Sequence, residues 1–118
     1  MTRRSDRPEP PLHEDALDLG RFAEPALHIL VSLADGPKHG YAIMADVEAV
    51  GGVRMGPGTL YGALARLEQR GLIEALPPED RRRPYRLTSV GDATVRAQLL
   101  RLAEFAAAGL ARAGRTAG

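Results

Sequence analysis

The chain has 118 residues, enough for one domain with a modest core and too few for two. Hydrophobic residues make up 44% of the chain, but aromatic residues only 4% and Trp is missing, so the core must be aliphatic. The lack of cysteine excludes disulfides, thiolate metal sites and a cysteine nucleophile. A net charge of +1 neither indicates nor excludes a nucleic-acid partner, so the local clustering of charge has to decide.

Residues 1–20 combine prolines, mixed charge and no sustained periodicity, which predicts a flexible tail. This tail is either an unstructured leader or an arm that contacts a partner through Arg3, Arg4 and Arg7. It lacks the apolar core of a secretory signal, and the longest apolar stretch, residues 26–34, is about half a membrane span. We therefore expect a cytoplasmic protein with no membrane partner.

Two helices are expected next. Glu24–Asp35 is apolar almost all round, which is typical of a buried helix, and Gly36 and Pro37 end it. Tyr41–Val50 carries apolar residues at i, i+4 and i+7, which indicates a helix with one buried face.

A glycine-rich segment, residues 51–58, follows the second helix and allows two interpretations. A phosphate-binding loop would need Lys at the position that Pro57 occupies, and a dinucleotide-binding loop would need a strand directly before it. Neither condition is met, so the segment is interpreted as an eight-residue connection that aims the next helix.

That next helix is expected over Thr59–Arg70, with Leu60, Leu64 and Leu67 as its core stripe and small or basic residues opposite. Two short strands, residues 72–76 and 85–88, surround a proline-containing loop and predict a β-hairpin. Helix, connection, helix and hairpin in this order predict a winged helix-turn-helix domain over residues 21–88. The expected fold is therefore mainly α with a small β-hairpin.

In a winged helix the second helix of the motif enters the major groove of DNA. Thr59 and Tyr61 lie at its start, where hydroxyls and free N–H groups suit phosphate oxygens, although Tyr61 could instead pack in the core. Arg66 lies opposite the core stripe, where it can reach a base edge or a phosphate. Arg81, Arg82 and Arg83, with Arg86 close by, are either a solvated charged face or a wing that neutralises phosphates.

The last helix is expected from about residue 90 to 112, capped by Ser89, and would be about 34 Å long. Its apolar residues step by four, three and four, as in a coiled-coil seam. The preceding elements can hardly cover a helix of this length, so residues 89–118 are expected to form a homodimer. The expected dimerisation residues are Val95, Leu99, Leu102, Phe105 and Ala106.

The sequence offers no catalytic constellation. His13, His28 and His39 are scattered, with no carboxylate at ligand spacing, and the serines lack a nucleophile-elbow context. We expect no enzyme activity, no metal and no cofactor.

Three separated motifs resemble those of the PadR family of bacterial transcriptional regulators. They are GPKHGY, GTLYGALARLE and YRLTSVG, and the similarity covers residues 26–93 with the last helix as its continuation. The resemblance implies a winged-helix domain that binds double-stranded DNA, a C-terminal dimerisation helix and a repressor role. It places Tyr41, with its neighbours Lys38 and His39, near the DNA backbone.

Some members of the family bind flat aromatic ligands between two subunits, so the resemblance also allows for a small-molecule effector. A dimer would present two recognition helices about one DNA turn apart, which predicts an inverted-repeat operator. The alternative function is a winged-helix module for protein–protein interaction. The wing arginines and the small residues on the outer face of the third helix favour DNA.

Overall fold

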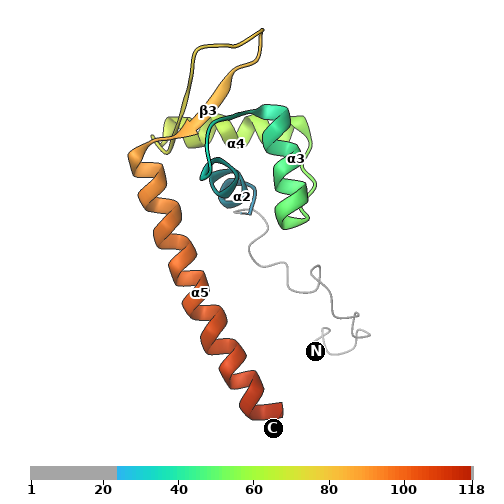
Figure 1. Ribbon diagram of the computed structural model, residues 1–118, viewed down its shortest axis with the longest axis vertical. Helices are drawn as coiled ribbons and strands as arrows, with labels where there is room; N and C mark the ends of the chain where they lie inside the picture. Colours follow the sequence, from blue (N-terminus) through green and yellow to red (C-terminus); the bar gives the residue numbers. More distant parts are fainter. Residues whose placement is uncertain (1–23, 118) are drawn as a thin grey trace, which may run out of the picture.

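The computed structural model describes residues 24–117, so the predicted N-terminal tail lies outside the described residues. The described chain is mainly helical, with a small antiparallel sheet, as the sequence predicts (Figure 1). Its elements in chain order are α2 (Glu24–Leu33), β1 (Lys38–His39), α3 (Gly40–Gly51), α4 (Pro57–Gln69), β2 (Ile73–Ala75), β3 (Pro84–Leu87) and α5 (Ser89–Ala117).

The core forms around α2, which packs against α3, α4 and the start of α5. Its members are aliphatic, as the composition requires, and most come from the predicted stripes. The largest fully buried side chains are Ile29, Ile43, Val47, Leu60, Leu64, Ile73 and Val95. Helix α2 is not buried all round, because Leu27 and Val31 are only partly covered, and Ala34 and Asp35 directly after it are exposed.

The connection between α3 and α4 is shorter than predicted. Helix α3 continues to Gly51, and Gly52 ends it with φ of 70°, a left-handed conformation in which its N–H bonds the carbonyl of Glu48 at 2.9 Å. The open stretch is therefore residues 52–56. Met55 from this stretch is buried in the core, which anchors the connection and fixes where α4 begins.

The sheet has three strands in the order β1-β3-β2, one more than the predicted hairpin. The extra strand, β1, pairs antiparallel with β3, with Lys38 opposite Tyr85 and His39 opposite Pro84. On the other side Glu74 of β2 lies opposite Arg86. Strand β1 is too short to show a period of two in the sequence, so only its partner strand identifies it.

Helix α5 begins one position earlier than predicted, and its cap is Thr88 rather than Ser89. The Thr88 hydroxyl accepts a hydrogen bond from the N–H of Gly91 at 3.0 Å and donates one to the carbonyl of Gly71 at 2.6 Å. Ser89 is the first residue of the helix. The predicted cap was wrong because the hydroxyl one residue earlier also holds the end of α4 in place.

Gly91 lies against the backbone of the residue that precedes β2. A Cβ atom built at Gly91 would stand 1.9 Å from the carbonyl oxygen of Leu72, and that oxygen accepts the N–H of Thr88 at 3.1 Å. Only glycine permits this approach. The start of α5 is thereby joined firmly to the segment that links α4 to the sheet, while the rest of α5 extends away from the other elements (Figure 1).

Candidate nucleic-acid interface

Helix α4 presents a polar outer face beside the sheet. Its apolar stripe is buried, and Thr59 and Arg66 are exposed on the other side. Gly56 caps the helix without a side-chain hydrogen bond and Pro57 occupies the first turn, so the N–H groups of Gly58 and Thr59 face outward. The positive end of the helix and a hydroxyl together suit an anionic oxygen.

Tyr61 combines the two roles that the sequence left open. Its side chain is 47% exposed, yet its hydroxyl lies directly over Gly40, where a Cβ atom would come within 2.2 Å of that oxygen. Gly40, the second glycine of the GPKHGY motif, therefore makes room for Tyr61 of the next motif. Tyr61 supports α4 on the start of α3 and keeps part of its ring at the surface.

The wing, residues 77–83 between β2 and β3, is closed by a tight turn. Glu79 and Arg82 exchange two backbone hydrogen bonds of 2.6 and 2.8 Å. The two central residues, Asp80 and Arg81, have φ of 48° and 71°. This is the hairpin turn that matches the twist of antiparallel strands, here formed without glycine, and it projects the Arg81 side chain at the tip.

The other wing arginines differ in their surroundings. Arg82 and Arg83 are exposed, and the Arg83 guanidinium donates to the carbonyl of Leu76 at 3.1 Å. Arg86, in contrast, donates to the Glu74 carboxylate at 2.7 Å across the sheet, so its charge is locally balanced. The free positive charge of the wing is therefore carried by Arg81–Arg83.

His39 of β1 touches the wing. Its Nε2 lies 3.3 Å from a terminal nitrogen of Arg82, within hydrogen-bond distance of the guanidinium. The other ring nitrogen, Nδ1, is buried without a hydrogen-bond partner among residues 24–117. The neighbouring Tyr41 is largely exposed on α3. His39 thus lies beside the wing, and the contact of His39 and Tyr41 with the DNA backbone stays a prediction.

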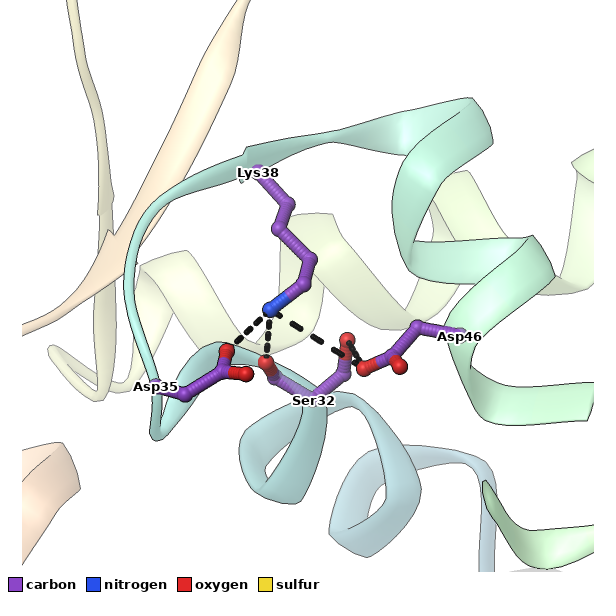
Figure 2. A network of polar contacts seen from close by, with 4 residues as sticks. All are labelled: Ser32, Asp35, Lys38 and Asp46. Carbon is purple, nitrogen blue, oxygen red and sulfur yellow. Dashed lines mark hydrogen bonds and ion pairs between the residues drawn. The ribbon is translucent and has the colours of Figure 1, made fainter. Parts of the chain in front are cut away.

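Lys38 is placed differently from the other expected contacts. Its side chain is only 19% exposed, and its ammonium bonds the carbonyl of Ser32 and the carboxylate of Asp35 (Figure 2). The hydrogen bond and charge of Lys38 hold the pKa of Asp35 below its usual range. The structure therefore separates Lys38 from the outward-facing residues of α4 and the wing.

Only the first residue of the predicted seam on α5 is buried. Val95 is buried against the core, whereas Leu99 and Leu102 are 40% and 42% exposed and Phe105 is 77% exposed. Ala106 is exposed as well. Leu110, which is not among the predicted seam residues, is 74% exposed and continues the same face four residues after Ala106.

Within residues 24–117, no group of three or more His, Asp or Glu side chains is placed to hold a metal ion. No helix over these residues is long and apolar enough to cross a membrane.

Helices α3 and α4 with the flanking sheet form a winged helix-turn-helix, a class of domain that transcriptional regulators use. The chain belongs to the transcriptional regulator PadR-like family, whose model matches residues 29–97. Membership confirms the resemblance read from the three motifs. It implies regulation through DNA binding, and the family is one of regulators and not of enzymes.

Individual relatives agree. The chain is 37% identical over 95 residues to transcriptional regulator Rv3488 of Mycobacterium tuberculosis, covering 78% of this chain and 88% of that protein. It is 57% identical over 63 residues to an uncharacterized 37.1 kDa protein in transposon TN4556 of Streptomyces fradiae, 53% of this chain and only 18% of that much longer relative.

Solved structures show the same fold. A transcriptional regulator from Clostridium thermocellum superposes with a TM-score of 0.65 at 26% identity, covering 86% of this chain and 96% of that one. RosR of H. salinarum superposes with a TM-score of 0.59 at 32% identity, covering 69% of this chain and 74% of that one.

Proposed function

We propose that the protein is a homodimeric repressor that binds an inverted-repeat operator in double-stranded DNA. The observation that carries this proposal is the outer face of α4, polar and exposed, lying beside a wing whose arginines are not neutralised by the sheet. A protein-binding module would instead favour a large apolar outer face on α4, where Tyr61 is the one exposed large hydrophobic side chain among the described residues.

On DNA, α4 would enter the major groove, with Arg66 directed at base edges or a nearby phosphate. A Cβ atom at Gly62 would lie 3.7 Å from the Arg66 guanidinium, so this side chain runs back along α4 with room to extend. Thr59 and the free N–H groups beside it would bind phosphate oxygens. Arg81, Arg82 and Arg83 would neutralise phosphates or enter the minor groove.

The dimer would form through α5, within the C-terminal unit of residues 89–118. The apolar face that buries Val95 in the core continues past it through Leu99 and Leu102 to Phe105, and these three side chains are exposed in the single chain. A second copy, related by a two-fold axis, would bury this face and set two α4 helices about one DNA turn, roughly 34 Å, apart.

A cytoplasmic location and release by a small-molecule effector complete the proposal. The cytoplasmic location follows from the DNA partner. Effector release rests on the family resemblance, and a compound that shifts the α5 contacts would change the spacing of the two α4 helices.

The proposal is tested by selecting duplexes from a random library with the full chain, followed by footprinting. We expect a paired, inverted footprint with half-site centres about 10 base pairs apart. Arg66→Ala should weaken binding to the selected duplex far more than to random duplex. Selection of a single half-site, or full affinity of the Arg66 variant, would count against the proposed geometry.

A further inference from the structure

The polar network around Lys38 joins three elements of the protein. The ammonium bonds the backbone carbonyl of Ser32 in α2 and the carboxylate of Asp35, and it lies 3.9 Å from the carboxylate of Asp46 in α3 (Figure 2). The Asp46 carboxylate in turn accepts a hydrogen bond of 2.7 Å from the buried hydroxyl of Ser32. One cation from β1 thereby connects the end of α2 with the middle of α3.

Strand β1 has contacts on both sides of the candidate interface. It pairs with β3, which carries one side of the wing, and its His39 touches Arg82. The next residue, Gly40, receives the hydroxyl of Tyr61 from α4. A displacement of β1 would therefore also displace the wing and the start of α4.

We propose that Lys38 is a positioning residue for DNA binding, which acts by fixing β1, and through β1 the wing, to the helical core. This inference rests on the proposed role of the wing arginines. It assigns to Lys38 no contact with DNA. The cluster of Lys38, Asp35 and Asp46 carries two negative charges and one positive charge, so it would repel a phosphate rather than attract it.

A direct phosphate contact would also break the network. To reach DNA the ammonium would have to leave two carboxylates and the Ser32 carbonyl, and the side chain is mostly covered where it lies. The loss of those contacts would oppose the gain from one phosphate. Lys38 at its present position serves DNA binding better as an anchor.

The direction in which one substitution changes the DNA affinity distinguishes a positioning role of this cluster from a Coulombic one. Asp46→Ala removes a negative charge, so a purely Coulombic role of this cluster predicts tighter binding to DNA. A positioning role predicts weaker binding, on the order of threefold to tenfold, because the link from β1 to α3 is lost. The matched control is Glu48→Ala on the same helix, which removes an equal charge from an exposed pair with Arg54 outside the network.

Binding is measured by fluorescence anisotropy of the full chain with the selected duplex and with random duplex at several salt concentrations. Lys38→Met and Asp46→Ala should both weaken binding, and Glu48→Ala should leave it equal or slightly tighter. Tighter binding by Asp46→Ala together with weaker binding by Lys38→Met would overturn the proposal.

A double-mutant cycle gives a second test. If Lys38 acts through the wing, Lys38→Met and Arg82→Ala should be non-additive, whereas Lys38→Met and Arg66→Ala on α4 should be closer to additive. Full additivity in the Arg82 cycle would overturn the positioning role. If Arg82→Ala alone had no effect on any duplex, the wing proposal itself would fail, and the two failures are distinguishable.

Thermal unfolding monitored by circular dichroism shows which variants are folded at the assay temperature. Should Asp46→Ala be unfolded there, Asp35→Asn replaces it, because Asp35 is exposed and its loss weakens the network from the solvent side. The same sign is expected: weaker DNA binding despite the loss of a negative charge, with tighter binding as the contradicting result.

Discussion

The winged head, residues 24–87, and the α5 extension, residues 99–117, show two ways in which a helix can use its apolar side chains. In the head, the apolar stripes of α2, α3 and α4 close on one another and are almost fully buried. In the extension, every described side chain from residue 99 to 115 is exposed, five large apolar ones among them. Since helical stability in proteins comes mainly from packing, we expect the extension, unlike the head, to pack against the second copy proposed above.

The residue that marks the boundary is Val95. It faces the core from the same side of α5 that carries Leu99 and Leu102, so one continuous stripe serves the fold of the chain first and an outer surface afterwards. In a single chain, an exposed apolar stripe on a helix can mean either poor packing or an interface with another chain. The stripe's regular spacing makes the interface the better explanation.

The largest effect is expected from charges placed on the extension. Replacing Leu99 and Leu102 by Asp should convert the proposed dimer to a monomer, because burying unpaired carboxylates is costly. Sedimentation at several concentrations measures the oligomeric state. Leu100→Asp is the matched control, since Leu100 is exposed about 100° round the helix from Leu99 and should leave the dimer intact. An unchanged dimer in the double variant would remove the proposed seam.

The joint between the two regions can be broken at Gly91. Gly91→Ala places a Cβ atom 1.9 Å from the Leu72 carbonyl oxygen, so either α5 shifts or the contact strains, at a cost of about 3 kcal/mol in the free energy of unfolding. Denaturant unfolding checks this. Gly109→Ala in the extension, where a Cβ atom meets nothing within 4 Å, should instead stabilise α5 by up to about 1 kcal/mol. Equal effects of the two variants would contradict the close joint.

In the head, the wing is tested at Arg82. Arg82→Ala should weaken binding to all duplexes to a similar degree and lower the salt slope by about 1, because a phosphate contact carries no sequence information. Arg86→Ala is the control, since Arg86 already bonds Glu74 and should leave the slope nearly unchanged. A loss confined to the selected operator would make Arg82 a base-reading residue.

The smallest effect concerns alkaline pH. Burial raises the pKa of Tyr85, and the Glu68 carboxylate adds to the rise. As pH rises, this phenol ionises in the unfolded chain before it ionises in the folded one. The contribution of Tyr85 to the free energy of unfolding is therefore fully present below the ordinary tyrosine pKa of about 10 and is lost as pH rises through the folded pKa. Tyr85→Phe should therefore lose less stability than the wild type above that pH. Absorbance titration at alkaline pH follows tyrosine ionisation. If the tyrosine with the highest pKa were still present in Tyr85→Phe, the assignment of the raised pKa to Tyr85 would be wrong.

The sequence by itself determined the helices, the core stripes and the family, because periodicity and local motifs are properties of neighbouring residues. The apolar steps of four and three that place Leu60, Leu64 and Leu67 on one face hold for any helix, whatever surrounds it. The aliphatic core, the wing and the apolar stripe on α5 follow in the same way, and the use of that stripe as a dimer seam stays a prediction.

Only the tertiary structure decided the contacts between distant segments. From the sequence alone, Lys38 is indistinguishable from any other surface cation. In the structure, Ser32, Asp35 and Asp46 surround its ammonium. Strand β1, the cap at Thr88 and the need for glycine at Gly91 likewise depend on partners far away in the chain, as with the Leu72 carbonyl. A local pattern cannot encode such pairs, because hydrogen bonds and close contacts depend on distance in space and not on separation along the sequence.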